Sequence, residues 1–174
     1  MQSADFIIIG AGIAGASLAY HIGRQGKTII LEREDQPGYH STGRSAAVYN
    51  SNYGPRLMRV MSKASGPFFF NPPTGFTDTP LLKPLGVMFV ARQDQAETLS
   101  ANMAVIAELT EDMKPISITE ANERAPILRP DYVAAATYDD STKDMDVNAI
   151  HSGYLRGAKK EGVSIVTDAQ VTAL

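Results

Sequence analysis

Three glycines between an apolar run and a small-residue run constrain the fold of this chain more than any other feature. Gly10, Gly12 and Gly15 form the pattern G-x-G-x-x-G. The apolar run over 4–9 predicts a buried strand, covered on both faces of a sheet, and the run over 13–24 predicts a helix. In that setting the first glycine allows a tight turn, the second lets a pyrophosphate approach the backbone, and the third lets the helix pack on the strand.

An acidic residue completes a nucleotide-binding pattern. Glu32 lies twenty residues after Gly12, at the end of a second apolar strand predicted over 28–31. A carboxylate at this place accepts hydrogen bonds from both ribose hydroxyls and repels a 2′-phosphate. The amides at the start of the helix supply N–H donors and a positive dipole end for the phosphates. The order of strand, glycines, helix, strand and acid predicts dinucleotide binding.

The same part of the chain has an uncharged stretch over 6–23, a length at which a transmembrane helix must be considered. This stretch contains the three glycines and the polar residues Ser17, Tyr20 and His21. A signal peptide requires Lys or Arg before its apolar run, and none precedes this one. We therefore expect no membrane span and a cytoplasmic protein.

Composition excludes several other classes of function. A formal net charge of −3 and the absence of any Lys/Arg run argue against a nucleic-acid partner. The absence of Cys excludes disulfides, thiolate metal sites and Cys nucleophiles. The three His are scattered without metal-ligand spacing, so we expect no metal site.

Periodicity and capping residues predict the remaining elements. We expect helices over 55–70 and from Asp94 to about Asp112, a short helix capped by Ser117, and a helix capped by Asp146. Further strands are expected over 86–91, 133–138, 163–166 and 169–173. Apolar stripes that face the core are predicted for the helix over 13–24, the helix that begins at Asp94 and the helix capped by Asp146. In that order, they are Ala14, Leu18 and Ile22; Leu99, Met103, Ile106, Leu109 and Met113; and Val147, Ile150, Tyr154 and Ala158.

Other residues that could carry chemistry have simpler interpretations. His21 and His151 are expected to be partly exposed helical residues, and His40 to make hydrogen bonds within a loop. The acidic residues Asp139, Asp140, Asp144 and Asp146 do not have the spacing of a calcium loop, and a turn and an N-cap explain them better. The run over 68–70, three Phe, is expected in the core or at a domain seam.

The segment after Glu32 distinguishes between dinucleotides. In a nicotinamide dehydrogenase the second strand normally leads into another crossover helix. Here it leads into a turn-rich loop that begins at Glu34 and ends in Ser, Thr, Gly, Arg and small residues at Ala47. Such a loop suits a backbone that follows an extended diphosphate and ribityl chain.

At these residues the chain resembles a known family. Residues 8–15, 31–34 and 38–47 are similar to the N-terminal part of FAD-dependent amino-acid oxidoreductases, the group of D-amino-acid dehydrogenase, glycine oxidase and sarcosine oxidase. The most similar branch is that of the bacterial D-arginine dehydrogenases. Shorter matching pieces lie over 71–73, 80–82, 136–139 and 153–157, so the resemblance runs along the whole chain.

The resemblance implies a set of FAD contacts. It places the pyrophosphate at the glycine turn, the adenosine ribose at the acid after the second strand, the ribityl chain and ring edge along the loop, and adenine at the last strand. The implied residues are Gly10, Gly12, Ala14, Gly15, Glu32, Arg33, Ser41, Thr42, Arg44, Ser45, Ala46, Ala47 and Val171.

The resemblance also implies a substrate pocket lined by Tyr53. Two positions depart from the arginine-specific branch, which has a histidine and a glutamate near the substrate. This chain has Val48 and Val87 there. We therefore expect neutral, apolar D-amino acids to be preferred to D-arginine.

The resemblance implies an α/β fold: a Rossmann-like FAD-binding domain over 1–82 and 146–174, with part of an α+β substrate domain inserted over 83–145. The implied reaction is oxidation of a D-amino acid, in which the Cα–H passes as hydride to flavin N5 and the imino acid hydrolyses to a 2-oxo acid and ammonia. No catalytic side chain is assigned, and the motifs do not specify the electron acceptor.

Two alternatives stay open at this point: an NAD-dependent Rossmann dehydrogenase, and a non-catalytic nucleotide-binding fragment. Only three parallel strands are predicted, and the family continues well beyond residue 174. We therefore expect an N-terminal fragment that is inactive alone and whose open sheet favours a homodimer or a missing C-terminal half.

Overall fold

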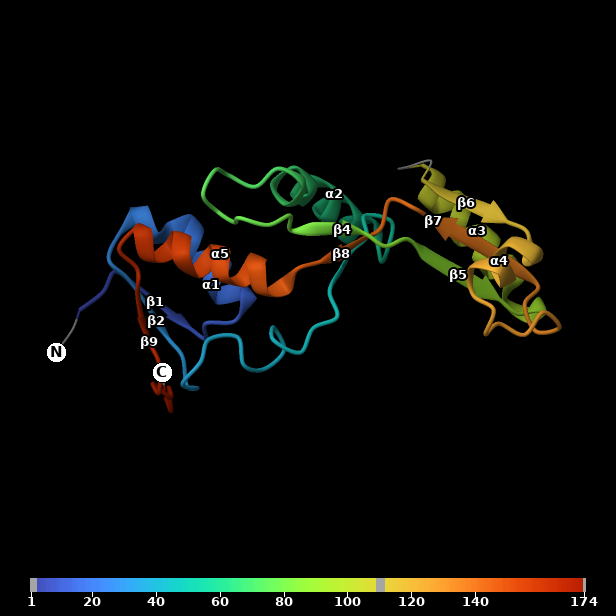
Figure 1. Cartoon of the computed structure of the whole chain (residues 1–174). Helices are drawn as coiled ribbons and strands as arrows, with labels where there is room; N and C mark the ends of the chain where they lie inside the picture. The colour runs from blue at the N-terminus through green and yellow to red at the C-terminus, as the bar shows by residue number, and fades with distance from the viewer. Residues whose placement is uncertain (1–2, 109–111, 174) are drawn as a thin grey trace. The chain divides into compact units, whose positions relative to one another are not determined.

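The structure, a computed structural model, describes residues 3–108 and 112–173, which fold into two compact units (Figure 1). Unit 1 comprises Met1–Ala47, Pro67–Leu81 and Met145–Leu174, and unit 2 comprises Val48–Gly66 and Leu82–Asp144. The segment 48–66, which we expected in the FAD-binding domain, thus belongs to unit 2. The assignment of nucleotide and substrate roles to 1–82, 83–145 and 146–174 stays a prediction.

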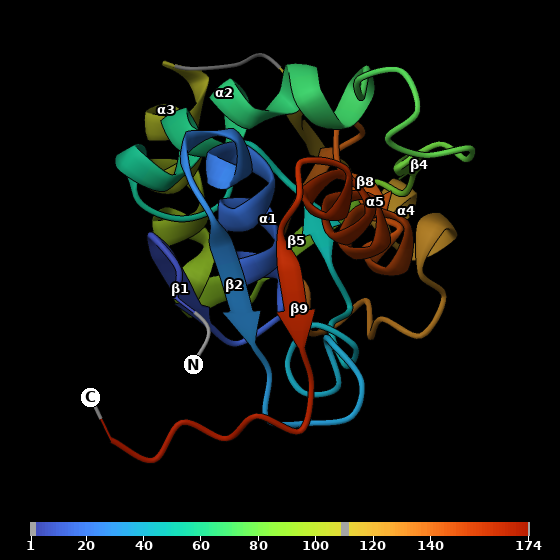
Figure 2. The ribbon, with the colours of Figure 1, turned by 90° about the vertical axis from the view of Figure 1, so that its left-hand side faces the viewer.

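Unit 1 is built on a parallel sheet of three strands. These are β1 (Phe6–Ile9), β2 (Thr28–Leu31) and β9 (Ser164–Val166), in the order β1-β2-β9 (Figure 2). Ile8 pairs with Ile30, and Ile30 with Ile165. The three predicted parallel strands are confirmed, and β2 has the predicted bounds.

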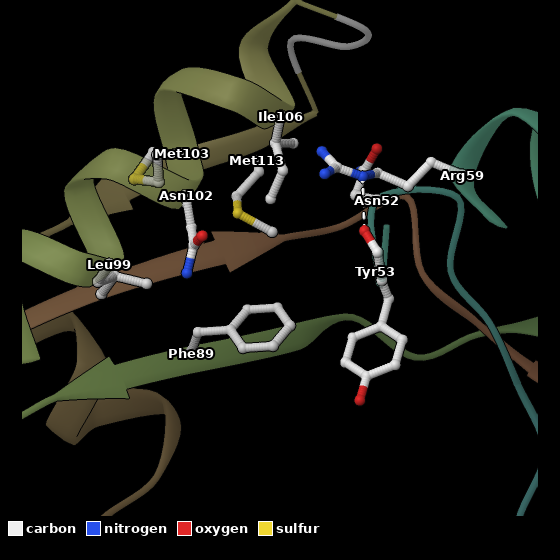
Figure 3. Close-up of a pocket in the computed structure, with 10 residues that line it drawn as sticks. Asn52, Tyr53, Arg59, Phe89, Leu99, Asn102, Met103, Ile106 and Met113 are labelled. Carbon is white, nitrogen blue, oxygen red and sulfur yellow. Dashed lines mark hydrogen bonds between the residues drawn. The ribbon is translucent and has the colours of Figure 1, made fainter. Parts of the chain in front are cut away.

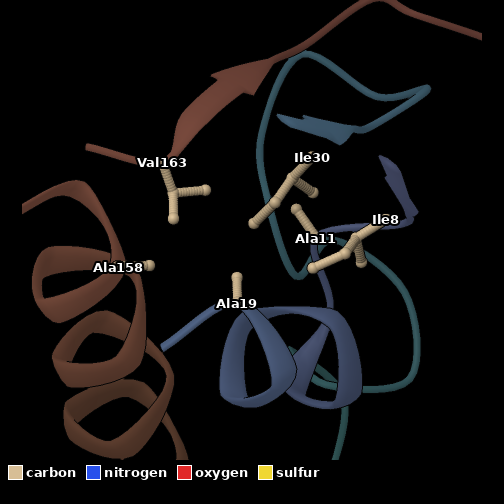
Figure 4. Close-up of a cluster of buried hydrophobic side chains, with 6 residues drawn as sticks. All are labelled: Ile8, Ala11, Ala19, Ile30, Ala158 and Val163. Carbon is tan, nitrogen blue, oxygen red and sulfur yellow. The ribbon is translucent and has the colours of Figure 1, made fainter. Parts of the chain in front are cut away.

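The helices of unit 1 pack on this sheet through small residues. Helix α1 (Ile13–Ile22) continues into a 3₁₀ turn, η1 (Gly23–Gln25), and α5 (Val147–Lys160) follows unit 2 in the chain. Ala19 of α1 and Ala158 of α5 face Ile8 and Ile30 of the sheet, and all four are buried (Figure 4). The uncharged stretch 6–23 thus forms β1, the glycine turn and α1. Among the described residues no helix is long and apolar enough to span a bilayer.

Two expectations about burial in this unit are wrong. In β1 only Ile8 is buried, while Ile7 and Ile9 are 62% and 55% exposed. The reason is that β1 is an edge strand whose alternating side chains point to opposite faces. In α1 the buried residues are Ala16 and Ala19, whereas Leu18 of the predicted stripe is 48% exposed.

Close contact between α1 and α5 explains the shifted stripe. Tyr20 lies directly against Gly157, where a Cβ would collide with the tyrosine ring. Gly157 of α5 thus makes room for Tyr20, which turns Ala16 and Ala19 of α1 into the core and leaves Leu18 outside it.

An aromatic cluster forms the second core of unit 1. The Phe68 ring stacks on Tyr154 with centroids 5.6 Å apart, and Phe76 lies edge-on to Tyr154. Phe68 and Phe69 come from the last turn of α2 (Arg56–Phe70). The core position expected of the Phe run is confirmed for these two, and Phe70 is 51% exposed.

Unit 2 contains two small sheets. One is antiparallel in the order β5-β7-β6, and the other has the order β3-β8-β4. Its helices are α3, α4 and the part of α2 up to Gly66, and the 3₁₀ turn η2 (Gln93–Gln95) precedes α3. The bounds are β3 (Val48–Tyr49), β4 (Leu82–Pro84), β5 (Val87–Ala91), α3 (Ala96–Ala107), β6 (Met113–Ile116), α4 (Ile118–Arg124), β7 (Ala135–Asp139) and β8 (Lys143–Met145).

The predicted amphipathic helix of unit 2 is shorter than expected. Leu99, Met103 and Ile106 lie on the half-buried face of α3, but Met113 lies on strand β6. Leu109, the remaining residue of the stripe, lies outside the described residues. Strand β6 contains Pro115 and is an edge strand, the position at which a sheet tolerates proline.

Two predicted N-caps are confirmed. The Ser117 hydroxyl accepts the Glu120 N–H at 3.1 Å, and the Asp146 carboxylate accepts the Ala149 N–H at 2.8 Å. The strand expected over 169–173 is not formed; the backbone there is irregular, and the Ala169 N–H donates to the Glu32 carbonyl at 2.8 Å.

The packing of α1 predicts a large effect of substitution on stability at Ala16 and a small one at Leu18. Ala16→Leu should lower the free energy of unfolding by about 1–3 kcal/mol, because Ala16 is fully buried among Phe76, Ile150 and Tyr154. Leu18→Ala should change it by less than about 0.5 kcal/mol because Leu18 is exposed. Urea unfolding of both variants measures this, and a larger loss for Leu18→Ala would contradict the packing.

Candidate cofactor site

At two positions, the backbone geometry of the glycine turn permits only glycine. Gly10 has φ +94°, a conformation that costs L side chains energy. A Cβ on Gly15 would collide with the Gly10 carbonyl oxygen, so the first turn of α1 lies directly against the turn. The predicted roles of a tight turn and a close helix approach thus have a geometric basis here.

Glu32 supports this turn from the end of β2. It is only 8% exposed, and its Oε2 accepts the Ala11 N–H at 2.7 Å. Its Oε1 accepts the Glu34 N–H at 3.1 Å. A carboxylate oxygen accepts more than one hydrogen bond, so these contacts leave capacity for ribose hydroxyls. Sequence reasoning predicted Glu32 as a ligand-binding residue but missed its bond to the turn.

A pocket of about 310 Å³ lies beside Glu32. Glu32, Arg33 and Val171, which the resemblance assigns to adenosine, meet there with Gly10, which it assigns to the pyrophosphate. Val171 belongs to the irregular C-terminal segment and not to a strand. The pocket therefore gathers the two segments that the resemblance assigns to adenosine and the first glycine of the turn that it assigns to the pyrophosphate.

Polar contacts organise the rim of this pocket. Arg33 donates to Glu34 Oε1 at 2.8 Å, and His40 Nε2 lies 2.6 Å from the same oxygen. The hydrogen bond from His40 lowers the pKa of the Glu34 carboxyl, and Arg33 lowers it further. Partial desolvation of the carboxyl opposes this shift. The expected loop hydrogen bonding of His40 is confirmed.

The start of α1 has free N–H donors. The N-cap is Gly12, which has no side chain to occupy them, and Thr42 Oγ1 accepts only the Ile13 N–H, at 2.9 Å. Within the described part of the chain, the N–H groups of Gly12, Ala14 and Gly15 donate to no protein acceptor. Free amides at a helix N-terminus suit a phosphate.

The loop after Glu34 folds on itself beside these donors. Its backbone bonds include Gly43 N–H to Gly38 O at 2.7 Å and Arg44 N–H to His40 O at 3.2 Å. One side of the loop lines an apolar pocket of about 430 Å³ together with α1 and α5. The predicted residues found there are Ser41, Thr42, Ser45 and Ala47.

Two predicted loop residues lie away from that pocket. The Arg44 guanidinium lies 5.2 Å from the Tyr39 ring centroid, and Ala46 is exposed. The pocket also contains Tyr154, whose pKa is raised by burial and, to a lesser degree, by Tyr20.

His151 corrects an expectation. It is 7% exposed instead of partly exposed, and its Nε2 lies 2.7 Å from the Ala11 carbonyl oxygen, to which a protonated nitrogen donates. The ring also lies against Gly38 of the loop. His151 therefore joins α5 to both the glycine turn and the loop. Its spacing of four residues after Val147 on the predicted inner stripe could have revealed this burial.

The carboxylates of the acidic cluster are used within the fold. Asp139 is fully buried, and its oxygens accept from the Asn52 side chain at 2.7 Å and from the Ser141 hydroxyl at 2.6 Å. Asp146 caps α5. The turn and N-cap interpretation accounts for these two residues.

The three residues predicted for the substrate pocket lie in unit 2. Tyr53, which is 64% exposed, lines a pocket of about 300 Å³ with Phe89 (Figure 3). Val48 of β3 pairs with Asp144 of β8, and Val87 of β5 pairs with Asp139 of β7. Neither valine is among the described residues that line this pocket.

Taken together, a parallel sheet, a glycine turn with free amides and a buried acid beside a pocket define a dinucleotide-binding α/β protein. These residues fit FAD, because the donors suit a pyrophosphate and the neighbouring residues Gly10 and Ile13 each line one of the two pockets. A family model described as FAD dependent oxidoreductase matches residues 5–174, so the chain belongs to that family. FAD is the cofactor of this family.

Solved structures share the fold. L-alpha-glycerophosphate oxidase from Mycoplasma pneumoniae, with FAD bound, has a TM-score of 0.82 at 19% identity over 99% of this chain and 46% of its own. L-proline dehydrogenase from P. horikoshii has 0.80 at 20% identity over 99% and 46%. Glycine oxidase from Bacillus cereus has 0.80 at 18% over 99% and 49%. The chain thus spans about half the length of these structures.

The predicted ribose contact can be tested at Glu32. Glu32→Ala should raise the FAD dissociation constant about tenfold or more, because a charge-assisted hydrogen bond contributes about 1.5–3 kcal/mol. Flavin fluorescence quenching measures the constant. Asp35→Ala, an exposed acid in the same loop, is the control and should leave it within about twofold.

Because Glu32 also holds the Ala11 N–H, circular dichroism must show that the variant is folded. Glu32→Gln keeps a carbonyl acceptor and should give an intermediate constant. An unchanged constant in folded Glu32→Ala would refute the ribose contact.

Proposed function

We propose that this protein oxidises neutral, apolar D-amino acids with FAD as the cofactor. The observation that carries the proposal is the meeting of Glu32, the free amides of α1 and the loop over 41–47 in a chain of the FAD dependent oxidoreductase family. D-amino acids are favoured by the resemblance to the D-amino-acid dehydrogenase group. The names of two of the solved structures, a glycine oxidase and an L-proline dehydrogenase, also support an amino-acid substrate.

The residues of unit 1 would divide the binding of FAD among them. The amides of Gly12, Ala14 and Gly15 would bind the pyrophosphate, and Glu32 would bind the ribose. The loop backbone would follow the ribityl chain. The full set consists of Gly10, Gly12, Ala14, Gly15, Glu32, Arg33, Ser41, Thr42, Arg44, Ser45, Ala46, Ala47 and Val171.

Bound FAD supplies a hydride acceptor for the Cα–H of the amino acid, and the resulting imino acid hydrolyses to a 2-oxo acid and ammonia. The chain's own contribution is to hold and orient the reactants. His151 fixes the Ala11 carbonyl, and Glu32 fixes the Ala11 N–H. Both backbone polar groups of one residue in the glycine turn, the N–H and the carbonyl of Ala11, are therefore held by buried side chains, which keeps the phosphate donors in place.

Two valines support the choice of substrate. Val87 occupies the position of a carboxylate that would pair with a cationic side chain, and Val48 makes the implied pocket less polar. Burying a guanidinium without a partner costs several kcal/mol. We further propose that the 174-residue chain alone binds FAD weakly and does not turn over substrate, since it spans less than half the length of the solved structures.

The product of the full reading frame provides the test of the function. Its visible spectrum should show bound flavin, which absorbs blue light, and a panel of D- and L-amino acids with an artificial electron acceptor should show turnover of D-amino acids. Reduction of NAD without flavin would favour the nicotinamide alternative. Preference for L-amino acids would refute the proposed stereochemistry.

Substrate preference gives a sharper prediction. The ratio kcat/KM should be at least about tenfold higher for D-leucine or D-methionine than for D-arginine. Val87→Glu should narrow this gap. Val90→Glu, on the opposite face of β5 and 41% exposed, is the matched control and should leave the gap unchanged. A higher kcat/KM for D-arginine in the unsubstituted protein would refute the assignment.

A further inference from the structure

The pocket that Tyr53 lines in unit 2 differs from the implied substrate pocket, because neither Val48 nor Val87 is among the described residues that line it. Its volume is about 300 Å³, and its wall is mostly apolar (Figure 3). Phe89 comes from β5, Met113 from β6, and Leu99, Met103 and Ile106 from α3. The pocket thus offers a surface on which an aliphatic group can be desolvated.

One cation lies in this apolar pocket. Arg59 of α2 donates its Nε–H to the Gly54 carbonyl oxygen at 2.8 Å. Its Nη1 is buried and, within the described residues, has no hydrogen-bond partner. Figure 3 shows the guanidinium group directed from α2 toward Ile106 and Met113. A buried guanidinium N–H without an acceptor is unfavourable, and a carboxylate satisfies it best.

No acid on the described wall neutralises Arg59. The polar side chains there are Asn52, Tyr53 and Asn102. Asn52 leads to a buried acid, Asp139, but the Oδ2 of Asp139 already accepts from Asn52 at 2.7 Å. Its Oδ1 accepts the Ser141 N–H at 2.9 Å and the Ser141 hydroxyl at 2.6 Å. The lining therefore carries a positive charge that an anion could balance.

We propose that this pocket binds an apolar 2-oxo acid, with the carboxylate on Arg59 and the aliphatic chain against Phe89, Met103 and Ile106. Among the described residues the wall has no acid for an α-ammonium group, which makes an amino acid a poorer ligand than the corresponding 2-oxo acid. The Asn102 amide can donate to the 2-oxo oxygen. This choice of ligand rests on the proposed function, of which an apolar 2-oxo acid is the product.

Methionine methyl groups report binding directly. The 174-residue chain, labelled with ¹³C at its Met methyls, is titrated with 4-methyl-2-oxopentanoate, and no FAD is needed. The signals of Met103 and Met113 should shift, because both residues line the pocket. Met88, in the cluster with Ala121 and Val133, and Met145, in unit 1, should not shift.

Substitutions in α2 test the contribution of the Arg59 charge to binding. Arg59→Gln should weaken binding about tenfold or more, and Arg59→Lys should bind with intermediate affinity because it keeps the charge without the planar fork. Arg56→Gln, an exposed arginine of α2, is the control and should leave the affinity unchanged. Unperturbed Met88 and Met145 signals show that each variant is folded.

Ligand comparison completes the test. D-leucine should bind at least about tenfold more weakly than the 2-oxo acid, and 4-methylpentan-1-ol, which has no carboxylate, should cause no shift. The proposal is overturned if Met103 and Met113 do not shift, if folded Arg59→Gln binds as well as the unsubstituted chain, or if D-leucine binds equally well. Absence of amino-acid oxidation in the full protein would refute the proposed function and leave these binding results unaffected.

Discussion

The hydrogen bond between the buried Glu32 carboxylate and the Ala11 N–H is the contact on which the site depends. It ties the end of β2 to the glycine turn after β1, while His151 ties the opposite side of the same residue to α5. Since Gly15 lies directly against the Gly10 carbonyl, the turn cannot move without moving α1. The direction of the free amides at the start of α1 thus follows from these contacts.

Local signals predicted much of this architecture. Strand β2 and the caps Ser117 and Asp146 are determined by residues within one turn or strand, which is why the sequence identifies them. The glycine turn and Glu32 form a pattern with its own chemistry. The structure brings Glu32, which that pattern predicted, to one pocket with Arg33 and Val171, which only the resemblance implied.

What the sequence did not reveal depends on contacts between distant segments. The buried face of α1 is decided by α5, whose Gly157 meets Tyr20, and not by the hydrophobicity of Leu18. His151 is buried because Ala11, far away in sequence, offers a carbonyl oxygen. Met113 forms a strand because β7 supplies the partner for β6. Periodicity within one element contains no information about such partners.

The interrupted order of unit 1 along the chain has a consequence for folding during synthesis. Strand β2 leaves the ribosome early, but its neighbour β9 follows only after the whole of unit 2. The length of this loop adds little to the free-energy cost of folding at equilibrium, because the entropy lost on closing a loop grows only logarithmically with its length. It delays the pairing, however, and contacts between distant segments form slowly. Ile8 and Ile30, which pack against Ala158 of α5 in the folded unit, therefore lack that cover against chaperones and proteases until α5 and β9 have been synthesised.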